Sequence, residues 1–248
     1  MRAPVLALVL SVLVVFAWPQ FLPTAQAGTI SANYLPLMGG DIHFTTNLPG
    51  HIGAKTSRGG ILFGFRDDLP AGFGVDNKVP SFFLASCVEI GEAIQLPANN
   101  DHLSVSNLLG SSTVLGGISG PVFFDATRTT RAEKLWGTFL ASATNATTAR
   151  AFQLALWEIG FDTDLTLAGP NTPFFVDVGQ FQAGITDLAE TWLAAILADE
   201  GQNQMARTRL LLLSSPGVQD LVTPIPEPAS LALLVFVGML MWPRRRRG

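Results

Sequence analysis

Cysteine, tyrosine and histidine are scarce in this 248-residue sequence, which has one cysteine, one tyrosine and three histidines. A lone cysteine, Cys87, excludes an internal disulfide, so it is a buried core residue, an intermolecular partner or a reactive group. A cysteine hydrolase would need a histidine near the thiol, and none of His43, His51 and His102 lies in a recognisable motif. His102 is interpreted as a turn residue. No glycine-rich stretch leads from a strand into a helix as a phosphate loop does, so nucleotide binding has little support.

Charged residues are also sparse, at 14% of the chain. Arg2 and the cluster Arg244, Arg245, Arg246 and Arg247 lie close to the two ends and account for a third of the 15 basic residues. The remainder is acidic, because it keeps all 19 Asp and Glu residues. An acidic domain does not favour nucleic acid or anionic membrane surfaces. We therefore expect a neutral or cationic partner and no nucleic acid.

Residues 1–27 have the pattern of a secretory signal peptide. A charged start is followed by an apolar run, and Ala25 and Ala27 form a small-x-small cleavage site. Two prolines after the apolar run disfavour a membrane helix that stays in place. The pattern predicts export.

A second targeting signal is predicted at residues 224–248. Pro226, Glu227 and Pro228 precede an apolar stretch at 229–242, and the four arginines follow. At about 1.5 Å per residue this stretch reaches only about 21 Å, against about 30 Å for a hydrocarbon core, and the arginines place its C-terminus in the cytoplasm.

This tripartite tail resembles the PEP-CTERM sorting signal. The resemblance implies a bacterial envelope protein that a membrane exosortase recognises and cleaves, in organisms that make exopolysaccharide. The C-terminal helix would then be a transient inner-membrane anchor, and the mature protein would reach the outer envelope, the cell surface or the extracellular matrix.

The region between the two signals, residues 28–223, is long enough to bury a substantial core as one domain. Short apolar or alternating runs separated by turn residues are typical of strands. Helical periodicity follows, and strand character then returns. The expected helices are 129–140, a helix around Gln153 and 186–199 with Thr186 as N-cap, and the returning strands are 209–213 and 218–222. We predict an α+β fold, with a β-sandwich or barrel framework and a helical insertion, flanked by a signal peptide and a C-terminal membrane helix.

The helix expected at 148–160 is apolar around most of its circumference, which predicts that it is buried. Thr147 or Thr148 is expected to cap its start and Gly160 to end it. Gln153 is its uncharged polar side chain, and burying a carboxamide without partners costs about 1–3 kcal/mol. Condensation with the Cys87 thiol, with loss of ammonia, would consume that group as an internal thioester.

Residues 152–157 resemble the Gln motif of bacterial surface thioester domains, in which a hydrophobic residue, Gln, any residue and two hydrophobic residues often end in Trp. Residues 85–88 resemble the strand that carries their cysteine, although Ser86 replaces the family's usual aromatic or large apolar residue. The resemblance implies that Cys87 and Gln153 are bond partners and couple covalently to amines on a surface protein or extracellular matrix. Each molecule would couple once without turnover, so no enzyme activity, catalytic residue or cofactor is expected.

A second interpretation stays open. The protein would be a non-catalytic structural or binding component of an exopolysaccharide matrix, and Cys87 and Gln153 would only pack in its core.

Metal binding is not predicted. Two carboxylate pairs could ligate calcium, but no complete loop with the required ligand spacing appears, so solvated turns are the better interpretation. Glu158 is assigned no role. The two pairs are Asp67 with Asp68 and Asp162 with Asp164.

Overall fold

The computed structural model describes residues 28–46, 53–66, 79–80, 82–88, 101–114, 121–169, 174–176, 183–215 and 218–225. Within these ranges, no helix combines the length and the apolar character needed to cross a membrane. Several sequence predictions lie outside the described residues: the signal peptide with Ala25 and Ala27, the motif Pro226, Glu227 and Pro228, the apolar stretch and arginine cluster after it, and His51, Asp67 and Asp68.

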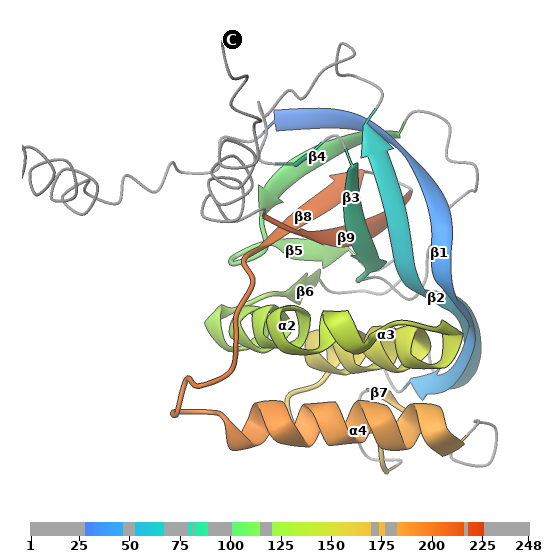
Figure 1. Cartoon of the computed structure of the whole chain (residues 1–248), viewed down its shortest axis with the longest axis vertical. Helices are drawn as coiled ribbons and strands as arrows, with labels where there is room; N and C mark the ends of the chain where they lie inside the picture. Colours follow the sequence, from blue (N-terminus) through green and yellow to red (C-terminus); the bar gives the residue numbers. More distant parts are fainter. Residues whose placement is uncertain are drawn as a thin grey trace, which may run out of the picture.

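Six antiparallel strands close into a barrel (Figure 1), which confirms the predicted β framework and shows that it is a barrel rather than a sandwich. Around the ring the order is β1, β2, β3, β9, β8 and β4, and β4 pairs with β1 again. Closure satisfies the main-chain hydrogen bonds of the ring without open edges. The strands are β1 (Gly28–Thr46), β2 (Gly53–Arg66), β3 (Phe82–Cys87), β4 (Asp101–Asn107), β8 (Leu210–Ser215) and β9 (Val218–Pro224).

Strand β1 closes the barrel because it is long enough to pair with both β4 and β2. Its first residues, 28–32, pair with β4, and residues 32–46 pair with β2. Its last two pair with the short strand β7 (Phe174–Phe175). The ribbon of β1 and β2 therefore continues past the barrel and along the helices (Figure 1). A separate hairpin is formed by β5 (Ser112–Val114) and β6 (Pro121–Phe123).

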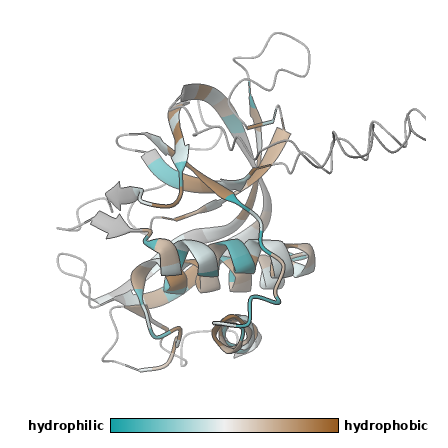
Figure 2. Cartoon of the chain, turned by 90° about the vertical axis from the view of Figure 1, so that its left-hand side faces the viewer, coloured by the Kyte–Doolittle hydropathy of each residue, from teal (hydrophilic) through white to brown (hydrophobic). Residues whose placement is uncertain are grey.

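The helices form an insertion between β6 and β8, as predicted. In Figure 1, α2 and α3 lie beneath one end of the barrel and α4 forms a further layer below them. Figure 2 shows α4 end-on in the same position. The elements are α2 (Ala126–Phe139), the 3-10 turn η1 (Leu140–Ser142), α3 (Ala146–Phe161) and α4 (Ala183–Ala198).

The helix starts differ from the sequence expectations. Helix α2 begins ahead of residue 129 because Asp125 caps it, accepting a hydrogen bond from Arg128 N at 2.8 Å. Helix α3 is capped by Asn145 rather than by Thr147 or Thr148. The Asn145 side chain accepts from both threonine N–H groups, and Thr148 Oγ1 accepts from Asn145 N in return. This reciprocal pair is a capping box.

Three further expectations about local structure are wrong. Gly160 does not end α3, because it does not adopt the left-handed conformation with which glycine terminates helices, and the helix continues to Phe161. Thr186 does not cap α4, which begins at Ala183. His102 is not a turn residue, since it lies in β4 opposite Ser31 of β1.

Two apolar cores lie on either side of the barrel wall. One fills the barrel and contains Phe83, Ala85 and Cys87 of β3. The other lies between the barrel and the helices, and Phe152 and Trp157 of α3 belong to it. All the α3 side chains after Arg150 are buried, which confirms the burial predicted from the composition of this helix.

A buried ion pair joins α2 to the end of α4. Lys134 Nζ lies 2.7 Å from Asp199 Oδ2, and the two side chains are 2% and 8% exposed. Asp199 Oδ1 also accepts hydrogen bonds from the main-chain N–H groups of Gln204 and Met205. The hydrogen bond with Lys134 is the first of the causes that lower the pKa of Asp199 below its ordinary value.

This ion pair should make the fold sensitive to acid. Because folding lowers the Asp199 pKa, its stabilisation is present above the unfolded-state pKa and is lost as the pH falls through the folded-state pKa. Asp199→Asn should lower the midpoint of thermal unfolding at neutral pH and reduce its dependence on acid. Circular dichroism melts over an acid series test this, with the exposed Asp187→Asn as control. An acid dependence that Asp199→Asn leaves unchanged would contradict the assignment.

Candidate functional site

Gln153 and Cys87, which the sequence places 66 positions apart, are in hydrogen-bond contact in the fold. Helix α3 packs against β1 and β2 and directs the buried Gln153 side chain at the strand pair β2–β3. The last paired residues of these two strands are Ile61 and Ser86. The carboxamide lies at the next position, where it bonds Gly60 and Cys87. The structure therefore brings the two predicted partners together.

Four hydrogen bonds hold the Gln153 carboxamide. Its Oε1 accepts from Ser86 Oγ at 2.7 Å, from Cys87 N at 3.2 Å and from Gly60 N at 3.3 Å. Its Nε2 donates to Cys87 O at 2.5 Å. One side-chain amide thus bonds both the N–H and the C=O of Cys87, as a neighbouring strand would.

These bonds answer one question that the sequence raises. The buried carboxamide of Gln153 must be either satisfied by hydrogen bonds or consumed by condensation, and the structure gives its oxygen three donors and its nitrogen an acceptor. Hydrogen bonds of this kind offset the cost of burying an amide. Relief of an unpartnered amide is therefore no driving force for condensation with Cys87.

The Cys87 side chain lies on the opposite face of β3 from Ser86. Side chains alternate along a strand, and the Ser86 hydroxyl points at Gln153 on the helix side. Cys87 packs into the barrel core and is 3% exposed. The carboxamide thus reaches Cys87 at the edge of the strand, while the thiol is carried on the barrel side.

Ser86 is fully buried and lies between two acceptors. Its Oγ is 2.7 Å from Gln153 Oε1 and 3.0 Å from Gly60 O. A hydroxyl has one proton and donates to one acceptor at a time. The departure from the family pattern at this position therefore supplies a donor that a large apolar residue could not.

Two adjoining glycines leave room for Gln153. A Cβ atom on Gly59 would lie 2.5 Å from Gln153 Cγ, closer than real carbon atoms approach. Gly60 has φ of +146°, which other residues rarely adopt, and its N–H is one of the three donors to Gln153. Opposite them in β1 lie Gly40 and Gly39.

His43, the histidine whose side chain the structure describes, does not join this arrangement. His43 Nδ1 lies 2.7 Å from Thr56 Oγ1 of the neighbouring strand. His102 lies in β4, opposite Ser31. The hydrogen bonds to the Gln153 carboxamide come instead from Gly60, Ser86 and Cys87.

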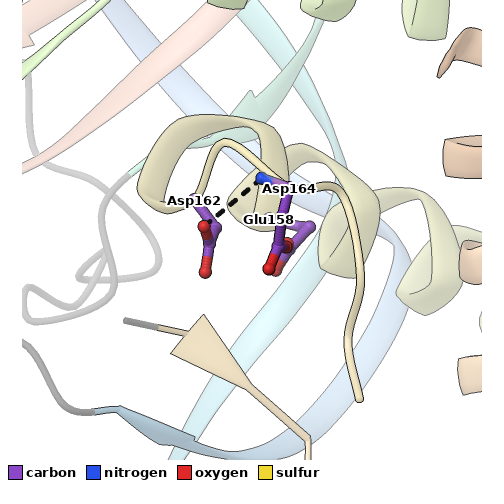
Figure 3. A group of neighbouring side chains, drawn as sticks. All are labelled: Glu158, Asp162 and Asp164. Carbon is purple, nitrogen blue, oxygen red and sulfur yellow. Dashed lines mark hydrogen bonds between the residues drawn. The ribbon is translucent and has the colours of Figure 1, made fainter. Parts of the chain in front are cut away.

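A group of carboxylates at the end of α3 corrects the interpretation of Asp162 as a solvated turn residue, whereas Asp164 is exposed as expected. Asp162 is 5% exposed and Glu158, one turn earlier, is fully buried. Figure 3 shows their side chains gathered with that of the exposed Asp164. Burial, followed by the charges of Asp162 and Asp164, raises the pKa of Glu158 to about 9. One oxygen from each residue lies within 4.8 Å of the others, so the group could hold a metal ion.

Comparisons with known proteins add little to this geometry. No protein-family model matches the chain, and no curated protein matches it. Among solved structures, the chain is similar to a pilus-presented adhesin, Spy0125 (Cpa), in its P1 form, with 11% sequence identity and a TM-score of 0.24. The alignment covers 80% of this chain and 87% of the adhesin chain. A TM-score this low carries no argument about fold or function.

Sequence reasoning missed the residues that seat Gln153. Ser86 was noted only as a departure from the family pattern, and Gly59 and Gly60 were not singled out. The pairs Gly39–Gly40 and Gly59–Gly60 were a usable signal, because consecutive glycines in two strands indicate a close approach of another element.

Proposed function

We propose that this chain is an exported cell-surface or extracellular-matrix protein in which Cys87 and Gln153 form an internal thioester that couples to amines on a partner. The observation that carries the proposal is the seating of the Gln153 carboxamide on Cys87 itself, with both main-chain polar groups of Cys87 bonded to it. Its Oε1 also faces three donors, counting those of Ser86 and Gly60.

Those donors suit the chemistry of thioester formation. The thiol is carried on the barrel side of β3, so it must swing past the edge of the strand to attack Gln153 Cδ. That attack places negative charge on Oε1, and preorganised donors stabilise such charge in a site that excludes water. When the tetrahedral intermediate collapses, the C–N bond breaks and the S–C bond remains. The thiol proton goes to the departing nitrogen, which keeps the two hydrogens of the carboxamide NH₂ group and leaves as ammonia.

Coupling would be a second acyl transfer at the same carbon, with the sulfur now as the leaving group. The nitrogen of a primary amine attacks Cδ of the thioester, the C–S bond breaks, and the proton lost by the amine is taken up by the Cys87 thiolate. The product is a secondary amide between Gln153 and the partner. Because Gln153 is consumed, one molecule couples once, and burial of the site protects the unreacted thioester from water.

The proposal of export and anchoring is supported by two segments of the sequence. The segment 1–27 resembles a signal peptide, and the tail with Pro226, Glu227 and Pro228 resembles a PEP-CTERM signal. We propose that an exosortase processes the tail and that the partner is an amine-bearing surface or matrix protein.

A second candidate function has one observation in its favour. The carboxamide of Gln153 is fully accommodated by hydrogen bonds without any covalent bond to Cys87. The pair would then be a buried polar link that fixes α3 to β2 and β3 in a structural or binding component of an exopolysaccharide matrix.

Intact-mass spectrometry separates the two candidates. The thioester protein should be one ammonia lighter than its sequence, and incubation with methylamine should add one methylamine to that lighter form. Cys87→Ala and Gln153→Ala should abolish both effects, whereas the exposed Gln202→Ala should keep them. A native protein with the full sequence mass and a thiol that reacts stoichiometrically with a maleimide would overturn the thioester and leave the structural candidate.

A further inference from the structure

The end of α3 gathers three carboxylates where a helix disfavours negative charge. Glu158 lies in the last turn, Asp162 is the C-cap residue, and Asp164 follows two residues later. The C-terminus of a helix carries partial negative charge and attracts cations. The last turn of α3 contains no basic residue. The three acids therefore add to the negative charge of the helix end, with no basic side chain in the last turn to oppose them.

The buried oxygens of this group lack hydrogen bonds. Both Glu158 carboxylate oxygens and Asp162 Oδ2 are buried without a partner among the described residues. Glu158 is fully buried, and Figure 3 shows its carboxyl group directed toward those of Asp162 and Asp164. A buried carboxyl group normally has a hydrogen-bond partner, so the unpartnered Glu158 points to a ligand that would bind it.

The remaining oxygens are used to shape the loop. Asp162 Oδ1 accepts from Thr163 N at 2.6 Å and from Asp164 N at 3.4 Å, and Asp164 Oδ1 accepts from Thr166 N at 3.0 Å. Leu165 has φ of +58°, an uncommon conformation for a residue with a side chain. The main chain is thus folded back so that Asp164 returns to Glu158, and the other oxygen of Asp162 stays unbonded.

A basic side chain that contacts this loop forms its ion pair with another acid. Arg131 of α2 donates to Thr163 O at 2.9 Å, and its Nε pairs with Glu200 at 2.7 Å. In the described part of the chain none of the three carboxylates forms an ion pair. Within those residues, no protein cation neutralises the group.

We infer that Glu158, Asp162 and Asp164 bind a calcium ion at the end of α3. Hard oxygen ligands suit Ca²⁺ or Mg²⁺, and no histidine or cysteine belongs to the group. Ca²⁺ accepts irregular geometry and bidentate carboxylates, which a helix end and a short loop supply, whereas Mg²⁺ requires a near-ideal octahedron. The exposed Asp164 opens the site to solvent, which supplies an entry path and water for the remaining ligand positions. The site does not depend on the thioester.

Thermal unfolding with added metal tests the inference. The full chain is stripped with EDTA and melted in CaCl₂, in MgCl₂ and in NaCl of equal ionic strength. At a calcium concentration about a hundredfold above Kd, the midpoint should rise by roughly 5–10 °C. Isothermal titration with CaCl₂ should give saturable binding with one ion per chain.

The variants distinguish calcium binding from a buried neutral acid. Glu158→Gln and Asp162→Asn should each abolish the calcium-dependent rise and the saturable heat, and Asp187→Asn, an exposed acid on α4, should keep both. Glu158→Gln should itself be stable without metal, because it removes a buried ionisable group. Absence of saturable binding to the wild-type protein, an equal rise with magnesium, or a rise that survives in Glu158→Gln or Asp162→Asn would overturn the calcium site.

Discussion

Gly59→Ala is expected to abolish the ammonia deficit that the proposed thioester would give the native protein, and to lower its thermal stability. The added methyl group would lie 2.5 Å from Gln153 Cγ, 2.7 Å from Ile42 Cδ1 and 3.1 Å from Trp157 Cη2. The first two distances are too short for real carbon atoms, so Gln153 and its packed neighbour Ile42 must both shift. Overpacking of a buried site costs about 1–3 kcal/mol.

The displacement of Gln153 should impair thioester formation more than it lowers the stability of the fold. The Gln153 carboxamide is held in one orientation by donors on three residues, and a displaced side chain loses those bonds together. A small misplacement of reacting groups is enough to slow a reaction by about a hundredfold. Intact mass should therefore return to the full sequence value, while circular dichroism should report a folded protein with a lower unfolding midpoint.

A matched glycine supplies the control. Gly184 lies near the start of α4, and a Cβ atom there would meet nothing within 4 Å. Gly184→Ala should keep the ammonia deficit and leave stability unchanged or slightly raised, because alanine is the better helix former. A Gly59→Ala protein that retains both the ammonia deficit and the wild-type midpoint would show that the Gln153 side chain does not lie against Gly59.

The local features of this fold were accessible from the sequence, since they depend on near neighbours. The helix expected at 148–160 is apolar around most of its circumference, which predicts its burial, and short apolar or alternating runs predict the β framework. The cap of α3 was misplaced because Asn145, Thr147 and Thr148 are all good capping residues, and only the reciprocal bond between Asn145 and Thr148 decides among them.

The distant features were not accessible. Barrel closure requires β4 to pair with both β1 and β8, and β3 with β9, which no local pattern specifies. The donors to Gln153 lie 66 to 93 positions away along the chain. The sequence assigns Glu158 no catalytic role, because it lies on a different side of the helix from Gln153. The turn that brings Asp164 back to Glu158 depends on an uncommon main-chain conformation at Leu165.

Ser86→Ala is expected to slow thioester formation by roughly 100- to 1,000-fold, the cost of removing one donor from a developing oxyanion. The Ser86 hydroxyl makes the shortest of the three contacts to Gln153 Oε1, at 2.7 Å, and it is fully buried. Alanine keeps the strand and the main-chain donors of Cys87 and Gly60, so the reaction should be slowed rather than abolished. The rate is measured by following the loss of ammonia with mass spectrometry after refolding from urea.

Ser86→Ala should slow thioester formation far more than it destabilises the fold. Loss of the hydroxyl leaves Gln153 Oε1 with two donors, so the stability cost should stay near 1 kcal/mol, the usual net worth of one hydrogen bond. Ser104→Ala, at an exposed position of β4, controls for the loss of a strand serine. If Ser86→Ala forms the thioester at the wild-type rate, the hydroxyl only holds the unreacted carboxamide. The charge on the reacting oxygen must then be stabilised by the N–H groups of Gly60 and Cys87 alone.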